Sequence, residues 1–295
     1  MQTFLHRFIR GQHKYYNKNR LSAQGEGNLR YICYNICMKS TSENVQNPQA
    51  PLSEDFVVNL PKTFPNSGEI IHNARNQIRV FDVNDHKINV KKFCIPPIVN
   101  RILYSLGWRT PKAVATYRNA LEILKRGFHT PAPYGYRIER KGGLIDFSYF
   151  VSAQESDMRP VSQAANDPAL INALAQYTAD MHAKGLWHKD FTPGNILFRV
   201  KDGKHEFSLI DINRFRFFDG PVPATIVRRN LAQPFYDDKN LSAFVEEYAR
   251  ITNWHGNLVH KVLRKKHLRN AYDNLKYNLK KLPLVDLFLG KPLKK

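Results

Sequence analysis

The chain has 295 residues, of which 42% are hydrophobic, and its 45 Lys and Arg exceed its 25 Asp and Glu to give a formal net charge of +20. This length is enough for one large domain or two modest lobes. Three cysteines exclude a disulfide scaffold and favour a reducing compartment. No run of about 18 apolar residues occurs, so no membrane-spanning helix is predicted. The charge predicts an anionic partner: nucleic acid, an anionic membrane face or a phosphorylated substrate.

Residues 1–52 show no sustained hydrophobic period and are rich in Asn, Gln, Ser and Lys, which predicts a disordered leader. The pattern then becomes strand-like. The segment "EIIHNARNQIRVFDV" contains two β-branched runs around a polar turn at residues 73–76, and "KINVKKFCI" supplies a third run. Together they predict an antiparallel meander.

A helix is predicted after Thr110, with Pro111 in its first turn and Gly127 just beyond its end. Its helically spaced apolar residues predict one buried stripe, made of Val114, Tyr117, Leu121 and Leu124. Two further strands, "YGYRIER" and "GLIDFSYFVS", follow. The first half therefore reads as a β-sheet that carries one helix.

The second half is predicted to be mainly helical. A helix opens at Asp167-Pro168 and closes near Gly185, and its apolar face is formed by Leu170, Leu174, Tyr177 and Met181. Two short strands, "NILFRV" and "EFSLI", come next, and the remainder is helical and basic. The pattern predicts an α+β bilobal fold, with a small antiparallel β-rich lobe over residues 53–154 and a larger, mainly helical lobe over residues 155–295.

The segment "WHKDFTPGNILF" carries ionisable groups at the offsets of a kinase catalytic loop. That loop is written H-R-D-x-x-x-x-N and is followed by an Asp at the end of a short hairpin. Here His188, Asp190 and Asn195 match the loop, and Asp211 in "LIDIN" matches the later Asp. Phosphoryl transfer needs a carboxylate near the incoming hydroxyl and oxygen ligands for divalent ions. We therefore predict Asp190 as catalytic base, Asn195 and Asp211 as Mg²⁺ ligands, and His188 as the residue that fixes the loop. The alternative is that Asp190 and Asn195 only stabilise a Thr-Pro-Gly turn.

These motifs resemble the lipopolysaccharide kinases of the Kdo and core-heptose type, a branch of the protein-kinase-like superfamily. The resemblance covers approximately residues 60–270, through "GEIIHNARNQIRVF", "INVKKF", "GFHTPAPYGY", "LWHKDFTPGNILF" and "SLIDINR". It implies the bilobal kinase-like fold, ATP and Mg²⁺ as cofactors, and phosphorylation of an alcohol group.

The resemblance also assigns cofactor-binding residues in the first lobe. Lys91 matches the strand lysine that contacts ATP phosphates, with the adjacent Lys92 as the competing candidate. Strand alternation puts Lys92 on the face of Ile88 and Val90, and Lys91 on the other face. Where the family helix carries a glutamate that pairs with this lysine, the matching position is Arg118.

Glu122, one turn after Arg118, can substitute for the missing glutamate or be an ordinary solvated helix charge. The turn expected to cover the phosphates, "HNARNQ", contains no glycine. Asn73 and Asn76 are predicted to supply its geometry instead, because Asn tolerates positive φ.

The acceptor is predicted to be a sugar rather than a protein. No A-P-E motif follows Asp211, and Thr192 stands where Ser/Thr protein kinases have Lys. Residues 261–295 contain eleven Lys or Arg against Asp273 and Asp286, which favours an anionic glycan or membrane surface. We expect a cytoplasmic enzyme acting on the lipopolysaccharide core or another anionic glycolipid, with peripheral contact to the inner face of the cytoplasmic membrane.

Two alternatives remain open at this point. One is a pseudokinase that acts as a binding or scaffold protein, because the glycine-rich loop is missing and Arg118 replaces the helix glutamate. The other is a kinase-like protein with a protein or RNA partner, suggested by the charge alone. Nucleic acid is disfavoured, because the basic residues are not interleaved with an aromatic platform.

Overall fold

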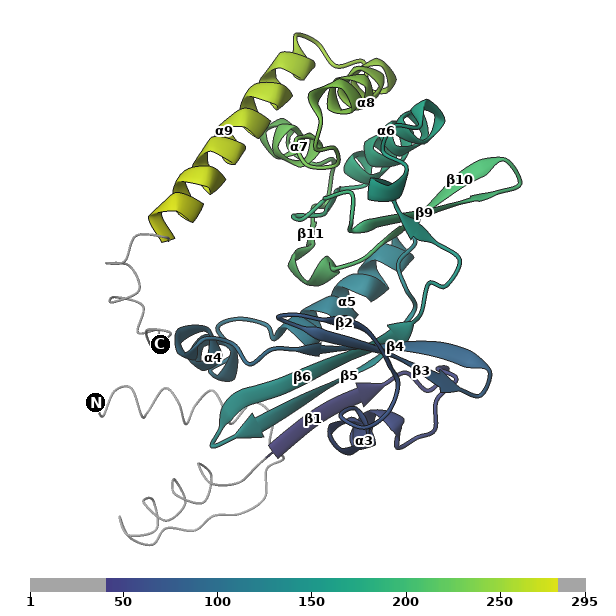
Figure 1. Ribbon diagram of the computed structural model, residues 1–295, viewed down its shortest axis with the longest axis vertical. Helices are drawn as coiled ribbons and strands as arrows, with labels where there is room; N and C mark the ends of the chain where they lie inside the picture. Colours follow the sequence, from purple (N-terminus) through teal and green to yellow (C-terminus); the bar gives the residue numbers. More distant parts are fainter. Residues whose placement is uncertain (1–40, 281–295) are drawn as a thin grey trace, which may run out of the picture. The chain divides into compact units, whose positions relative to one another are not determined.

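The structure, a computed structural model, describes residues 41–280. The chain divides into two compact units (Figure 1). Within the described range, unit 1 contains residues 41–125 and 130–156, and unit 2 contains residues 126–129 and 157–280. The predicted fold class is confirmed, because a β-rich unit precedes a mainly helical one.

Unit 1 is built on a six-stranded antiparallel sheet with the strand order β1-β5-β6-β4-β3-β2. The predicted meander forms its β2-β3-β4 edge, with the polar turn at residues 74–76. The strands span Thr41–Gln46 (β1), Glu69–Asn73 (β2), Gln77–Val83 (β3), His86–Phe93 (β4), Pro133–Lys141 (β5) and Leu144–Ala153 (β6).

β1 corrects the predicted leader over residues 1–52. Its six residues, Thr41–Gln46, pair with β5 from Thr41 opposite Arg140 to Gln46 opposite Gly135. Their side chains are mostly exposed, so no apolar alternation marked them as a strand. Backbone pairing with β5 holds this edge strand in place, and such pairing cannot be inferred from the amino-acid composition of the segment. Residues 1–40 of the predicted leader lie outside the described residues.

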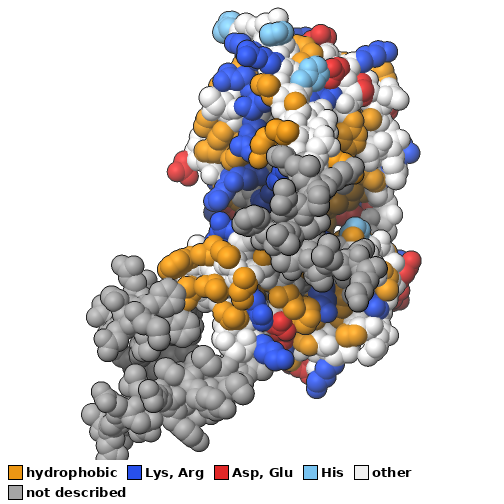
Figure 2. Space-filling view, turned by 60° about the vertical axis from the view of Figure 1, so that its left-hand side comes forward, with side chains coloured by type: hydrophobic (Ala, Val, Ile, Leu, Met, Phe, Trp, Pro, Cys, Tyr) orange, Lys and Arg blue, Asp and Glu red, His pale blue; other side chains and the backbone are white. Residues whose placement is uncertain are grey.

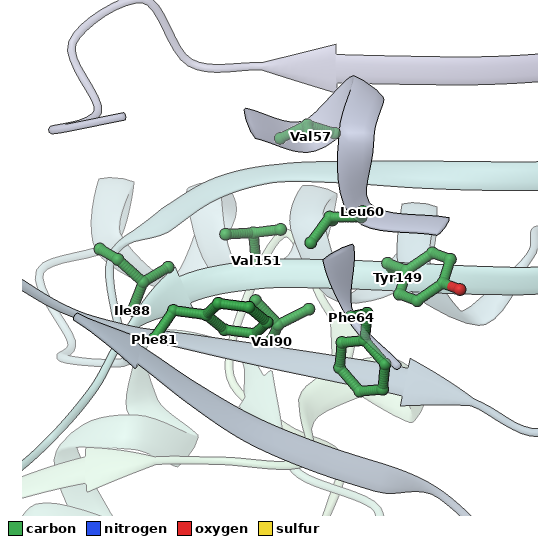
Figure 3. Close-up of a cluster of buried hydrophobic side chains, with 8 residues drawn as sticks. All are labelled: Val57, Leu60, Phe64, Phe81, Ile88, Val90, Tyr149 and Val151. Atoms are coloured by element: carbon green, nitrogen blue, oxygen red, sulfur yellow. The ribbon is translucent and has the colours of Figure 1, made fainter. Parts of the chain in front are cut away.

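Helix α3 (Phe56–Thr63) covers one face of the sheet, and the sequence analysis did not predict it. Figure 3 shows its buried side chains directed toward those of the strands. The cluster consists of Val57, Leu60, Phe64, Phe81, Ile88, Val90, Tyr149 and Val151. The rings of Phe64 and Tyr149 meet edge to face with 5.4 Å between centroids. Pro61 inside the helix explains why the helical signal was weak.

Helix α5 (Lys112–Lys125) packs on the second hydrophobic cluster of the sheet. The helix was predicted correctly, but its buried stripe was not: Leu121 and Leu124 are 45% and 37% exposed. The buried side chains are Ala113, Val114, Thr116, Ala120 and Ile123, so of the predicted stripe Val114 is buried and Tyr117 is half-buried. Small residues let the helix approach the sheet closely, so the larger leucines lie outside the contact. Periodicity alone cannot choose between two such faces.

Helix α4 (Ile98–Ser105) precedes α5 and buries none of its residues fully. Ile98 and Val99 are 60% and 66% exposed. Among the described residues, no helix is both long enough and apolar enough to cross a lipid bilayer.

Unit 2 places its helices around short strands. The helices span Pro168–Ala183 (α6), Ala224–Leu231 (α7), Asp238–Ile251 (α8) and Leu258–Lys280 (α9). The strands span Arg159–Pro160 (β7), Leu186–Trp187 (β8), Ile196–Lys201 (β9), Lys204–Leu209 (β10) and Arg216–Phe217 (β11), and short 3-10 turns occupy Val161–Gln163 (η1) and Ile212–Arg214 (η2).

The boundaries of α6 follow the predicted signals. The Asp167 carboxylate accepts the backbone N–H of Ala169 at 2.9 Å and so caps the helix. Gly185 ends it with φ of +73°, and a β-carbon there would collide with the Phe218 carbonyl. This fixed end determines where β8 and the loop after it begin.

We predict that Phe64→Ala destabilises the protein by about 3–5 kcal/mol, because it removes a fully buried ring from the α3 cluster. The free energy of unfolding in urea measures the effect. Val58→Ala, at a 40% exposed position of the same helix, is the control and should change it by less than about 1 kcal/mol. Equal effects of the two substitutions would contradict the packing of α3.

Candidate active site

The predicted catalytic loop connects β8 to β9 and folds as successive tight turns. The backbone N–H of Thr192 donates to the Asp190 carbonyl at 2.8 Å, and that of Asn195 donates to the Thr192 carbonyl at 2.9 Å. Phe191 is fully buried between these turns and anchors the loop to the core of unit 2. Its burial turns the neighbouring Asp190 and Thr192 toward the partly exposed side.

His188 holds the loop to the strand that leads to Asp211. Its Nε2 donates to the Ile210 carbonyl at 2.9 Å, and its Nδ1 accepts the backbone N–H of Asp190 at 3.1 Å. A carbonyl can only accept and a backbone N–H can only donate, so the ring carries its proton on Nε2. Burial lowers the pKa of His188, in keeping with a neutral ring. The ring lies 5.3 Å from that of Phe215, centroid to centroid.

A buried polar chain reaches the loop from three helices, and the sequence analysis did not identify it. Asn230 on α7 donates through Nδ2 to the His188 carbonyl at 2.8 Å, and its Oδ1 lies 2.8 Å from Nε2 of His182 on α6. Nδ1 of His182 lies 3.0 Å from the hydroxyl of Tyr248 on α8. Because the His188 carbonyl can only accept a hydrogen bond, the donor and acceptor of every bond in the chain are determined. Tyr248 donates to His182, His182 donates to Asn230, and Asn230 donates to the His188 carbonyl.

The Asp190 carboxylate forms an ion pair with Arg214. Arg214 lies at the end of η2, three residues after Asp211. Its side chain is 63% exposed, whereas that of Asp190 is 26% exposed. The guanidinium therefore orients the carboxylate from the solvent side.

Asn195 and the segment before Asp211 meet at the open end of the β9–β10 hairpin. The Ile210 N–H donates to the Asn195 carbonyl at 3.0 Å, which extends the ladder one step beyond the Ile196–Leu209 pair. Asn195 donates its side-chain amide to the Asp190 carbonyl at 2.9 Å, which leaves its Oδ1 as a potential metal ligand. Asp211 has φ of 53° and ψ of 45°, the left-handed region that Asp and Asn adopt more readily than other non-glycine residues.

The donor set fits Mg²⁺ better than a softer metal. An amide oxygen and a carboxylate are hard ligands, and Mg²⁺ in phosphotransferases takes one or two carboxylates together with phosphate oxygens and water. Over residues 41–280 no group of three or more His, Cys, Asp or Glu side chains forms a metal cluster. The Asn195 and Asp211 pair requires no such cluster.

Four cations gather beside the catalytic loop. Burial lowers the pKa of Lys189, and the nearby guanidiniums of Arg216, Arg229 and Arg214 lower it further. The Lys189 ammonium lies 5.0 Å from the centroid of the Trp187 ring, and Arg216 is opposite Trp187 in the β11–β8 pairing. Such a concentration of positive charge next to Asp190 favours an anionic ligand.

In unit 1, the two candidate lysines of β4 lie on opposite faces, as strand alternation predicted. Lys92 shares the α3 face with Ile88 and Val90, and its ammonium is 4.0 Å from the centroid of the Phe147 ring. Burial there lowers the pKa of Lys92. Lys91 is opposite Phe150, a member of the cluster on which α5 packs. The cofactor-binding role of Lys91 stays a prediction.

Three other predicted residues belong to unit 1. Glu122 lies on α5 and is half-buried. The geometric reason given for Asn73 and Asn76 is wrong, because neither has a positive φ. Asn76 acts through its side chain instead: its Oδ1 accepts the N–H of Cys94 at 3.2 Å and ties the β2–β3 turn to the end of β4. The cofactor-binding roles of all three residues stay predictions.

The comparisons with known proteins agree with the resemblance found in the sequence. The model of the lipopolysaccharide kinase (Kdo/WaaP) family matches residues 80–219, a shorter span than predicted. The span includes Lys91, Glu122 and the catalytic loop, but neither Asn73 nor Asn76. The match supports a phosphotransferase with a hydroxyl acceptor. No curated protein matches the chain.

Two solved structures are similar. A structure described as WaaP in complex with acyl carrier protein matches at a TM-score of 0.52 and 16% identity, over 78% of this chain and 98% of that chain. The Rio2 kinase-ADP/Mg²⁺-phosphoaspartate complex from Chaetomium thermophilum matches at a TM-score of 0.44 and 14% identity, over 88% and 84% of the two chains. The first match confirms the kinase-like fold.

We predict that the protein loses stability below about pH 6.5. Burial lowers the pKa of His182 from 6.5 to about 4. The unfolded chain therefore binds a proton that the folded chain refuses between pH 6.5 and 4, and stability falls as the pH falls through this window. The loss from His182 approaches about 1.4 kcal/mol per pH unit.

Urea unfolding of the wild type and of His182→Gln at pH 7, 6 and 5 measures this dependence. The variant should be less stable at pH 7, because the polar chain is interrupted, but its stability should fall less steeply toward pH 5. His188 still titrates in the variant and contributes a residual slope of the same sign. Parallel profiles would show that His182 does not titrate on unfolding.

Proposed function

We propose, on the premise that the chain is similar to the lipopolysaccharide kinase (Kdo/WaaP) family, that it transfers the terminal phosphoryl group of ATP to a hydroxyl of a Kdo or heptose sugar in the lipopolysaccharide inner core. The single observation that carries the proposal is the arrangement around His188. One neutral ring joins the backbone of Asp190 to the strand that ends at Asp211, and Asn195 bonds to both segments.

The residues of the loop would divide the chemistry among them. Asp190 would accept the proton of the acceptor hydroxyl as that oxygen attacks the phosphorus, and Arg214 would hold the carboxylate in place. Asn195 and Asp211 would hold Mg²⁺, which when bound neutralises charge on the phosphates. In unit 1, Lys91 would contact ATP phosphates, with Glu122 as its partner and the turn between Asn73 and Asn76 covering them.

The cations beside Asp190 support an acceptor that carries its own negative charge. Arg214 and Arg216 are exposed, and Lys189 is half-buried beside Trp187. A carboxylate or phosphate on the sugar would pair with these side chains and bring a neighbouring hydroxyl toward Asp190. Kdo, an acidic sugar, meets this requirement. A lipid-linked acceptor places the reaction at the cytoplasmic face of the inner membrane, with the protein bound peripherally.

We predict that Asp190→Asn lowers turnover on the order of 10²- to 10⁴-fold, because a positioned proton acceptor is lost. The assay is Mg²⁺-dependent transfer of labelled phosphate from ATP to a Kdo- and heptose-containing core lipid. Asp202→Asn makes the same chemical change at the exposed β9–β10 turn and should leave turnover within about twofold. Wild-type turnover in Asp190→Asn would refute the assigned base.

A pseudokinase is the second candidate, because the turn at residues 74–76 contains no glycine and Arg118 takes the place of the usual helix glutamate. Such a protein would bind a partner without transferring phosphate. Mg-ATP separates the two candidates, since a ligand that binds the native state raises its melting temperature.

We predict that Mg-ATP raises the melting temperature of the wild type and that Lys91→Met weakens this binding by about 10- to 100-fold, the usual effect of losing a charge-assisted contact. Lys92→Met is the matched control. It should keep the response to Mg-ATP, because its side chain lies on the α3 face beside the Phe147 ring. If Mg-ATP does not raise the melting temperature of the wild type, the pseudokinase is favoured. If only Lys92→Met loses this rise, Lys92 rather than Lys91 is the lysine that contacts ATP.

A further inference from the structure

Helix α9 contacts the rest of unit 2 through its first half. Asn257 caps its start by accepting the N–H of His260 at 2.9 Å, and Leu258 and Val262 are buried. Lys266 is only 4% exposed, donates to the Asp238 carboxylate at 2.8 Å, and also reaches the Tyr236 carbonyl. Nε2 of His267 lies 2.8 Å from the other oxygen of Asp238. The helix is therefore fixed to the start of α8.

The second half of α9 carries large apolar side chains that remain in solvent. Leu268, Tyr272 and Leu275 are 62%, 63% and 58% exposed. They are four and three residues apart, so they lie on one face of the helix. All described side chains from Leu268 to residue 278 are exposed, so no part of the described chain covers this face.

The same helix is strongly basic. It contains one acidic residue, Asp273, and seven basic ones: Lys261, Arg264, Lys265, Lys266, Arg269, Lys276 and Lys280. Lys261, Lys265 and Arg269 follow one another at four-residue spacing, where like charges repel. Figure 2, which brings the α9 side of unit 2 forward, shows Lys and Arg side chains gathered in a band beside hydrophobic ones. A negatively charged surface would relieve this repulsion.

From these observations we infer that the exposed half of α9 docks on an anionic lipid bilayer, with Leu268, Tyr272 and Leu275 entering the interface and the flanking cations contacting lipid headgroups. A helix with an apolar stripe between basic residues binds membranes in this way. Tyr272 suits the headgroup level, because its ring is apolar and its hydroxyl is polar.

The other occupants fit the surface less well. A nucleic acid would satisfy the cations but leave the two leucines in water. A second copy of the chain would bring two strongly basic helices together. A bilayer that contains anionic lipid matches both the charge and the apolar stripe. The inference does not depend on the proposed phosphoryl transfer, because membrane binding requires neither ATP nor the acceptor.

The test measures sedimentation of the full chain, without nucleotide, with vesicles of phosphatidylethanolamine and phosphatidylglycerol at about 70:30, where the anionic fraction supplies the surface charge. We expect binding, and little binding to pure phosphatidylcholine vesicles. Leu268→Gln/Leu275→Gln should lower the partition coefficient at least tenfold, because two apolar side chains no longer enter the lipid. Neutralising Lys261 and Lys265 to Gln should lower it about fivefold for each cation.

The matched control is Ile98→Gln/Val99→Gln on α4, the exposed apolar pair of unit 1. It should change partitioning less than twofold. Because all four positions are exposed, both variants should keep the wild-type melting temperature within a few degrees.

The inference is overturned if the wild type does not bind the anionic vesicles. It is also overturned if the α9 pair binds like the wild type, or if the α4 pair alone loses binding.

Tighter binding to a single-stranded RNA oligomer than to vesicles, insensitive to the leucine substitutions, would assign the basic face to nucleic acid. A change of sedimentation coefficient in the α9 pair, without vesicle binding by the wild type, would assign the stripe to a protein contact. Asp190→Asn, which removes the proposed catalytic base, should still bind the vesicles. That result would show that membrane docking and phosphoryl transfer can fail independently of each other.

Discussion

The direction of a single hydrogen bond organises the centre of unit 2. The His188 carbonyl can only accept, so Asn230 must present its amide nitrogen to it and its amide oxygen to His182. The ring of His188 is set in the same way, between an N–H that must donate and a carbonyl that must accept. Every buried partner is satisfied by one proton arrangement, and the charged forms of both histidines are disfavoured by burial.

This network explains how the loop can be precise although its outer residues are partly exposed. Phe191 fills the core beneath the loop, and His188 ties its start to the strand before Asp211. Asn195 then ties its end back to the Asp190 carbonyl. The backbone is therefore held at three points, and at two of them, Phe191 and His188, by groups to which no contact with the reacting atoms is assigned. Asp190 needs only Arg214 to orient its side chain.

The sequence predicted what depends on local spacing and missed what depends on distant partners. The catalytic loop, the hairpin after it and the capped helix α6 were identified, because turn residues and period encode them within about twenty positions. Asn230 and Tyr248 were missed, because a buried Asn or Tyr has no spacing signal of its own and its partners are 42 and 66 residues away. β1 and α3 were missed for the same reason: an exposed edge strand and a helix that contains Pro61 are held by the sheet rather than by their own pattern.

Unit 2 also connects its basic surface to its catalytic loop through one continuous set of packed helices. α9 packs on α7 and α8, and these two helices provide Asn230 and Tyr248 to the polar chain. The buried Lys266 fixes the start of α8 against α9, so the exposed half of α9 has a defined direction within the unit. A helix attached by a flexible linker would concentrate the protein at a surface without orienting it. In the proposed docking, a helix anchored through a buried lysine would restrict the orientations in which Asp190 meets the bilayer. An enzyme acting on a lipid-linked hydroxyl would gain from that restriction, because orientation replaces part of the entropy cost of reaction.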